Sequence, residues 1–129
     1  MQDMISGPET RAMIRATLAP RAEITFEVPY TDGGTVGDMT GPWVGPDGFF
    51  DGWAEWLSLW SEFTFSDPEL VDVGDGTFLL LVMCRGRMRA GGGEIRQEAG
   101  AVYTVRDGQI QGIRQFLDQS QARQAAGLT

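Results

Sequence analysis

Aromatic residues recur at helical spacing between residues 45 and 63, and this pattern constrains the fold more than any other feature of the chain. Successive rings are four, three, four and three residues apart, which keeps them on one face of an α-helix. Such a face either packs in a core against a sheet or forms part of the wall of an apolar ligand cavity. The rings belong to Phe49, Trp53, Trp56, Trp60 and Phe63.

The composition is that of one ordinary domain covering residues 1–129, with 42% hydrophobic and 22% charged residues. A formal net charge of −8 argues against nucleic acid and membrane surfaces as partners, because both require clustered basic side chains. The longest apolar run, Phe78–Cys84, is too short to cross a bilayer, and the first residues show no basic segment followed by a long hydrophobic one. We therefore expect a cytoplasmic protein in which the single cysteine, Cys84, is a small buried residue.

The first half of the chain predicts a helix, a strand and a loop. Glu9–Ala19 has a helical pattern that stops at Pro20. Glu23–Val28 alternates apolar and polar residues strictly and is followed by a proline, which indicates a strand. Thr31–Gly45 is rich in glycine and has no periodicity, so we expect an irregular loop of a length that is often functional.

Beyond the aromatic run the pattern has a period of two up to Leu117, with turn signals at residues 73–76, 90–93 and 106–109. This predicts an antiparallel meander. With a turn centred on Gly91 and Gly92, Arg87 faces Arg96, and Arg89 and Arg85 face Glu94 and Glu98. That register gives an inner apolar face, directed at the aromatic helix, made of Leu80, Val82, Cys84, Gly86, Met88, Ile95, Gln97, Ala99, Ala101 and Tyr103.

The outer face of the same strands carries two different surfaces. The arginines near the second turn form either a solvated strip of ion pairs with the neighbouring glutamates or a binding site for a phosphate or carboxylate. Further along, the outer face is too apolar to be left in water, and we expect it to form a homodimer interface. This apolar patch consists of Leu79, Leu81, Met83 and Val102.

The order of these segments resembles a SnoaL-like member of the nuclear transport factor 2-like superfamily, from about Thr10 to Leu128. The resemblance rests on the Gly-Pro-Asp-Gly helix start at Gly45, the segments Val102–Ile110 and Arg114–Asp118, and a closing Ala-Ala-Gly-Leu. It implies an α+β fold in which a strongly curved antiparallel sheet forms a cone covered by helices, with the usual first helix missing or shortened. It also implies an apolar cavity inside the cone and, frequently, a homodimer through the convex face of the sheet.

Known catalytic residues of similar proteins do not carry over to this sequence. The acids of ketosteroid isomerases fall at about Val28 and Ala101, and the polar groups of limonene-epoxide-hydrolase-like members fall near Val82, Cys84 and Gln115. The aspartate of SnoaL-like polyketide cyclases has no identifiable counterpart. The chain contains no histidine, which excludes histidine-based nucleophile sets and metal sites. We expect neither a metal nor a cofactor.

The remaining candidates are polar groups on apolar walls. Tyr103 and Gln97 could orient a carbonyl or hydroxyl group, or could simply be satisfied interior groups. Glu27 could serve as a general base, although alternation places it opposite Phe26. Either Arg114 or Gln115 faces the cavity, depending on whether the last hairpin contains a bulge. Glu27 and Tyr103 are the catalytic candidates, and the ligand-binding set is Trp56, Trp60, Val82, Cys84, Gln97, Ala101, Tyr103, Arg114 and Gln115.

Three functions remain open. The first is a SnoaL-like enzyme of isomerase, cyclase, hydratase or hydrolase type, which a carboxylate in the cavity would favour. The second is a non-catalytic binding module for a small apolar or aromatic molecule, which an apolar cavity without a carboxylate would favour. The third is a structural or partner-binding domain, which a cavity filled by Trp56 and Trp60 would favour.

Overall fold

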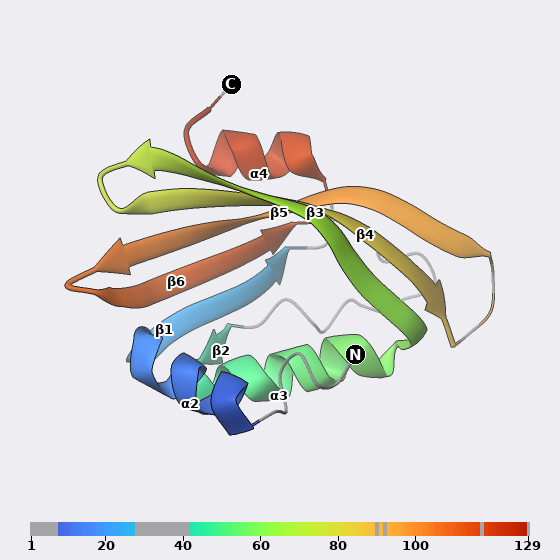
Figure 1. The fold of residues 1–129 in the computed structure, drawn as a ribbon, viewed down its shortest axis with the longest axis horizontal. Coiled ribbons are helices and arrows are strands. Elements are labelled where there is room, and N and C mark those ends of the chain that lie inside the picture. Colours follow the sequence, from blue (N-terminus) through green and yellow to red (C-terminus); the bar gives the residue numbers. More distant parts are fainter. Residues whose placement is uncertain (1–7, 28–41, 90, 92, 117, 129) are drawn as a thin grey trace.

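The computed structural model describes residues 8–27, 42–89, 91, 93–116 and 118–128, and for Glu27 the backbone alone. Within these ranges the chain forms three helices and one six-stranded sheet with the order β2-β1-β6-β5-β4-β3 (Figure 1). Neighbouring strands are antiparallel except β1 and β6, which are parallel. The elements are α2 (Pro8–Thr17), β1 (Leu18–Glu27), β2 (Trp43–Val44), α3 (Gly45–Ser58), β3 (Trp60–Gly74), β4 (Thr77–Met88), β5 (Glu94–Arg106), β6 (Gln109–Phe116) and α4 (Gln119–Ala125).

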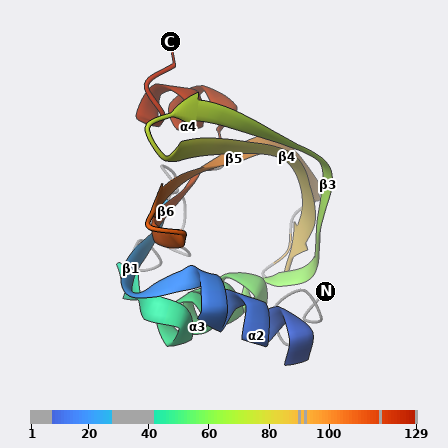
Figure 2. The same cartoon turned by 60° about the vertical axis from the view of Figure 1, so that its left-hand side comes forward.

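The sheet is strongly curved and arches over α2 and α3, whereas α4 lies on its outer side (Figure 2). The predicted α+β fold with a curved sheet covered by helices is thereby confirmed. A short helix, α2, precedes the sheet. Among the helices of the described ranges, none combines the length and the hydropathy that a bilayer-spanning segment requires.

The first helix ends earlier than the sequence pattern predicts. The pattern extends to Ala19, but α2 ends at Thr17 and β1 already begins at Leu18. A proline has no N–H to donate and disfavours a helical conformation in the residue before it, so the chain is extended ahead of Pro20. The pairing of β1 with β6 is irregular over this stretch, between Leu18 and Glu23.

The alternation predicted for the first strand is confirmed where the structure describes it. Ile24 and Phe26 are buried, with 0% and 2% of their surface exposed, whereas Glu23 is exposed. The end of the predicted strand, Val28, lies outside the described residues. So does most of the predicted loop, whose described residues, 42–45, contain β2 and the first residue of α3.

The aromatic run is divided between two elements, so the prediction of one helix reaching Phe63 is wrong. The helix closes at Leu59, whose N–H donates a hydrogen bond to the Trp56 carbonyl at 3.1 Å. The Leu59 carbonyl then accepts from the N–H of Arg89 at 3.0 Å, which ties the chain to the end of β4. Strand β3 begins at the next residue, Trp60.

The strand assignment beyond this point follows from a period of two. Phe63 is buried and Phe65 is partly buried, whereas Glu62 and Thr64 are exposed. An alternating segment that pairs with β4 buries one face of aromatic rings and satisfies its backbone at the same time. A helix continued through Thr64 would not place Phe65 on the aromatic face.

The turns after β3 and after β5 lie where the sequence predicts them. Each has an aspartate and a glycine with positive φ, namely Asp75 and Gly76 in the first and Asp107 and Gly108 in the second. Two successive positive φ angles match the twist of an antiparallel hairpin, and Asp-Gly is a favoured pair at such positions.

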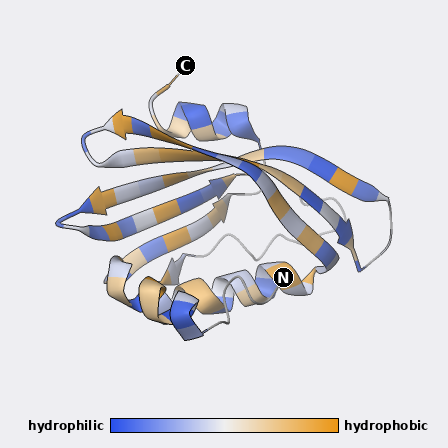
Figure 3. Cartoon of the chain, viewed as in Figure 1, coloured by the Kyte–Doolittle hydropathy of each residue, from blue (hydrophilic) through white to orange (hydrophobic). Residues whose placement is uncertain are grey.

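The hairpin between β4 and β5 has a different register from the one predicted. Arg87 faces Glu94 and Arg85 faces Arg96, a displacement of two residues, because the connection runs from residue 89 to residue 93. Arg85 approaches Glu94 to 3.7 Å. A displacement of two leaves each residue on its predicted face. Hydrophilic residues gather at this end of the sheet (Figure 3).

The apolar patch on the outer face is covered by the chain's own last helix. Leu79, Leu81 and Val102 are 0%, 5% and 5% exposed and form a cluster with Phe116, Ala122 and Ala126. Helix α4 therefore already removes these three residues from water within the single chain, so they are not an exposed apolar patch. The homodimer itself stays a prediction. Met83, the fourth residue of the patch, is partly exposed beyond this cluster.

Candidate functional site

A cavity of about 330 Å³ lies between α3 and the concave face of the sheet. Helix α3 forms one wall, β3 a second wall and the strands β4, β5, β6 and β1 the floor. Its lining is largely apolar. The lining residues are Phe26, Phe49, Trp53, Trp56, Leu57, Phe63, Phe65, Pro68, Leu80, Val82, Cys84, Ala99, Gly100, Ala101, Tyr103, Gln115 and Phe116.

The walls of the cavity are made of aromatic rings that pack against one another. Trp53 meets Phe26 edge-to-face at 5.4 Å and Phe65 at 5.7 Å between ring centroids. Phe63 and Phe65 meet edge-to-face at 5.0 Å. Edge-to-face pairs at such distances are favourable beyond their burial alone, so these rings support each other along the wall.

The floor is made of small residues on β5. Ala99 and Ala101 are buried and direct their side chains toward the cavity, which leaves space below the rings of α3. Gly100, between them, allows α4 to pack closely on the opposite face of the strand, because a Cβ at this position would lie 2.7 Å from the Cβ of Ala122. The cavity therefore exists because large side chains on the helix face small ones on the strand.

Three polar side chains line the cavity: Tyr103 on β5, Gln115 on β6 and Cys84 on β4. Within the described part of the chain, neither Tyr103 nor Gln115 has a side-chain hydrogen-bond partner. Burial raises the pKa of the Tyr103 phenol above its ordinary value and that of the Cys84 thiol to about 12. Both groups are therefore neutral near pH 7, and the phenol is available as a hydrogen-bond donor.

No aspartate, glutamate, lysine or arginine is among the described residues that line the cavity. Glu27 follows the lining residue Phe26, and its backbone pairs with another lining residue, Phe116. The structure does not describe where the Glu27 side chain lies. As a catalytic candidate it stays a prediction.

Six of the nine residues predicted to bind a ligand line this cavity. Trp60 does not: it is 6% exposed and lies in the core, with its ring tilted against Trp56 at 5.5 Å and against Phe63 at 5.0 Å. The break between α3 and β3 places it there. The six that line the cavity are Trp56, Val82, Cys84, Ala101, Tyr103 and Gln115.

Gln97 lies on the predicted face but outside the cavity. It pairs with Cys84 across β4 and β5, yet it is exposed, as are all the residues of β5 from Glu94 to Glu98. This end of the hairpin extends past the aromatic walls. Alternation therefore predicted the correct face of the strand for Gln97, but not that the residue lies beyond the end of the cavity.

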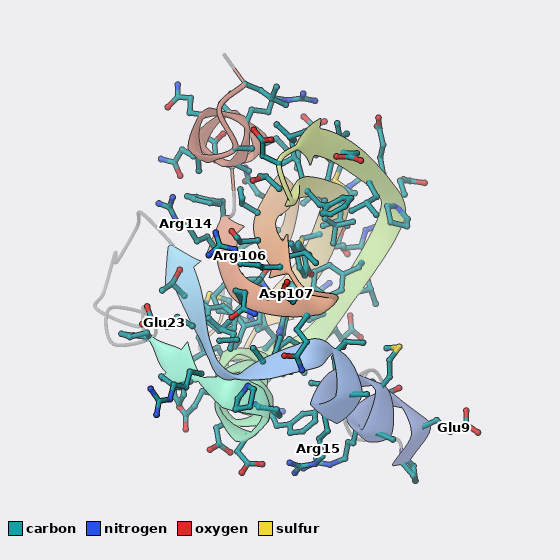
Figure 4. All side chains as sticks on the ribbon, turned by 90° about the vertical axis from the view of Figure 1, so that its left-hand side faces the viewer. Glu9, Arg15, Glu23, Arg106, Asp107 and Arg114 are labelled. Atoms are coloured by element: carbon teal, nitrogen blue, oxygen red, sulfur yellow. The ribbon has the colours of Figure 1, made fainter. Side chains whose placement is uncertain are left out.

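The choice between Arg114 and Gln115 is decided by a bulge in β6. Thr104 faces Gly112 and Val105 faces Ile110, so Gln111 is the extra residue. Gln115 consequently lines the cavity, whereas Arg114 is exposed on the outer side of the sheet, where Figure 4 labels it.

The outer side around Arg114 has a second, more open hollow of about 470 Å³ on β1, β5 and β6. Its lining is more polar than that of the main cavity. Arg21 and Glu23 from β1 contribute charges of both signs, and Thr25 and Thr104 contribute hydroxyl groups.

Sequence reasoning missed two lining residues of β3. Phe65 and Pro68 contribute to the wall beside the floor of β4 and β5. The two-residue step from Phe63 to Phe65 was the available signal for Phe65, because it fits a strand and not a helix. Pro68 follows Asp67, which has a φ of 53°, at an irregularity in the pairing of β3 with β4 that local sequence does not reveal.

Comparison with known proteins identifies relatives by sequence and by fold. The sequence model of the SnoaL-like domain family matches residues 10–113 of this chain. Among curated proteins, none matches the sequence significantly. A nuclear transport factor 2-like protein from Burkholderia thailandensis has a similar structure, with a TM-score of 0.68 and 24% identity over 96% of this chain and 90% of that one.

Two further solved structures share the fold. A putative SnoaL-like polyketide cyclase from Jannaschia sp. superposes with a TM-score of 0.61 and 13% identity over 98% of this chain and 88% of that one. A putative isomerase from Bacillus subtilis superposes with a TM-score of 0.59 and 20% identity over 99% and 84%. The family match covers most of the chain and the curved sheet is the shared fold, so the chain belongs to the SnoaL-like family of nuclear transport factor 2-like proteins.

Proposed function

We propose that this protein binds a small, flat and mostly apolar molecule in the cavity between α3 and the sheet, without transferring protons itself. The observation that carries the proposal is the lining: aromatic walls, a floor of small residues and no carboxylate among the described lining residues. The volume of about 330 Å³ falls at the lower end of the range for small-molecule sites, roughly 300–1,000 Å³.

Burial of apolar surface supplies the free energy of binding in such a site. Each Å² of apolar surface removed from water contributes about 25 cal/mol, and the loss of translational and rotational freedom offsets part of the sum. A rigid fused-ring molecule loses little conformational freedom on binding. Its flat shape also suits the space between the rings of Trp53 and Trp56 and the floor at Ala101.

The proposal is tested with 2-ethylnaphthalene, a flat hydrocarbon, by equilibrium dialysis. We expect saturable binding of one molecule per chain. Ala101→Leu adds three carbon atoms at the floor and should weaken binding by about tenfold or more, because overpacking an occupied site costs roughly 1–3 kcal/mol. Val82→Phe, from the neighbouring strand, should have the same effect.

Ala54→Leu is the matched control, since it makes the same change on the exposed side of α3. It should leave binding unchanged. Thermal unfolding followed by circular dichroism establishes that each variant is folded. Unchanged affinity in folded Ala101→Leu and Val82→Phe would show that the hydrocarbon binds elsewhere, and the proposal would be wrong.

An enzyme of small-molecule metabolism is the second candidate, and Glu27 is the carboxylate that it would use. This residue lies between two cavity contacts, as the neighbour of Phe26 in sequence and the partner of Phe116 in the sheet. Proteins of the same fold include a putative polyketide cyclase and a putative isomerase. In isomerase or cyclase chemistry, a carboxylate would accept a proton from the carbon next to a carbonyl, and the Tyr103 phenol would donate a hydrogen bond to the enolate oxygen.

Deuterium exchange at the methyl group of 2-acetonaphthone distinguishes the two candidates. In D₂O, an enolising enzyme removes a methyl proton and returns a deuteron from solvent, and Glu27→Gln abolishes this exchange. A binding module leaves the exchange at the rate seen in buffer alone. The third reading, a purely structural domain, is not favoured, because Trp60 lies in the core and Trp56 leaves the cavity open.

A further inference from the structure

Two of the three polar side chains of the cavity lie together on one part of its wall. Tyr103 and Gln115 lie on the adjacent strands β5 and β6, where Tyr103 pairs with Ile113 and Gln115 pairs with Ala101. They are therefore diagonal neighbours on the concave face. Helix α3 and strand β3 contribute only apolar and aromatic residues to the lining. The wall thus has a polar side at β5–β6 and an aromatic side at α3–β3.

Both polar side chains have unused hydrogen-bonding capacity. Neither makes a side-chain hydrogen bond within the described ranges, although each lies against an apolar cavity. Buried polar groups are ordinarily hydrogen-bonded, and a phenol without a partner loses the free energy of its bonds to water. A ligand atom that accepts a hydrogen bond would restore that bond at the Tyr103 hydroxyl.

Charged ligands fit this wall poorly. A carboxylate moved from water into the cavity would lose its hydration and find no cation among the described lining residues. Arg114, the sequence neighbour of the lining residue Gln115, lines the outer hollow instead. Arg85, the neighbour of the lining residue Cys84, is exposed and lies 3.7 Å from Glu94. The net charge of −8 on the whole chain adds a further repulsion toward anions.

Building on the proposed function, we infer that the cavity selects neutral flat molecules that carry a hydrogen-bond acceptor such as a ketone oxygen at one edge. The acceptor binds at Tyr103 and Gln115, and the rings extend toward Trp53 and Phe65. The corresponding carboxylates are excluded. The site therefore discriminates by charge as well as by shape, and the bound molecule has one preferred orientation.

Three probes of similar size test this selection by equilibrium dialysis at pH 7: 2-acetonaphthone, 2-ethylnaphthalene and 2-naphthoate. We expect the ketone to bind about fivefold more tightly than the hydrocarbon, the usual size of one net hydrogen bond. The naphthoate should bind at least tenfold more weakly than the ketone. Tyr103→Phe keeps the ring and removes the hydroxyl, so in this variant the ketone should lose its advantage over the hydrocarbon.

Gln115→Met provides a second variant, because it keeps the length of the side chain and removes the amide. It should reduce the preference for the ketone over the hydrocarbon. The inference is overturned if the ketone has no advantage, if its advantage survives in Tyr103→Phe, or if the naphthoate binds as tightly as the ketone. These results leave the proposed function intact, provided that Ala101→Leu still blocks the hydrocarbon. If Ala101→Leu leaves hydrocarbon binding unchanged, the proposed function fails as well.

Discussion

Small residues decide where space is left inside this domain. Ala99 and Ala101 face the cavity from β5, and their alternation with Gly100 along one strand could be predicted from the sequence, as could the side on which Tyr103 lies. The exposure of Gln97 could not be predicted. Alternation reports which face of a strand a residue occupies, but the position at which the cavity ends depends on where α3 stops.

The thiol of Cys84 gives a prediction at the same scale. Burial raises its pKa from the ordinary value of 9.0 to about 12, so the folded chain favours the neutral thiol more than the unfolded chain does. The resulting stabilisation is present below pH 9 and is lost as the pH rises toward 12. We therefore expect urea unfolding to show that the free energy of unfolding of the native chain falls relative to that of Cys84→Ala as the pH rises from 8.5 to 10.5.

The Cys84→Ala variant retains Tyr103, whose raised pKa acts in the same direction, so the comparison isolates the thiol. A difference that stays constant across this range would contradict the burial of Cys84. Alkylation by iodoacetamide at pH 8 supplies an independent readout: it should be slow in the folded chain and fast in urea.

Among the elements, the junction of α3 and β3 shows why the aromatic spacing predicted a helix that reaches Phe63, although α3 ends at Ser58. Trp56, Trp60 and Phe63 have helical spacing, and Phe63 and Phe65 have strand spacing, so the local sequence fits both readings. Pairing of Trp60 with Met88 decides between them. A Cβ at Gly86 would lie 2.6 Å from the Trp60 ring, so this glycine makes room for the indole. Such contacts join segments far apart in the chain.

The packing of α4 on the outer face of the sheet predicts how much Leu81 contributes to stability. Leu81 lies beneath this helix with 5% of its surface exposed, so its side chain stabilises the single chain. Leu81→Ala should lower the free energy of unfolding by about 2–4 kcal/mol, as for other buried leucines. Light scattering should give the same mass for the variant and the native chain. A fall from a two-chain mass to a one-chain mass, with stability retained, would contradict the packing of α4 and favour an interface instead.

For the whole molecule, the sequence predicts the curved sheet, the covering helices and an apolar interior, because alternation and turn residues are local signals. The polarity of the cavity depends on features that are not local. One extra residue in β6, Gln111, turns Gln115 inward and Arg114 outward, and α4 folds back over the outer face. The first of these features keeps Arg114 on the outer side, so no cation is among the described lining residues.

The most direct test of binding is a crystal structure of the protein with 2-acetonaphthone. The naphthalene rings are expected between Trp53 and Ala101, with the ketone oxygen about 2.5–3.0 Å from the Tyr103 hydroxyl. Electron density for the probe only on the outer surface, with the rings of Trp53 and Phe65 closed over an empty floor, would contradict the central claim that this cavity is a binding site.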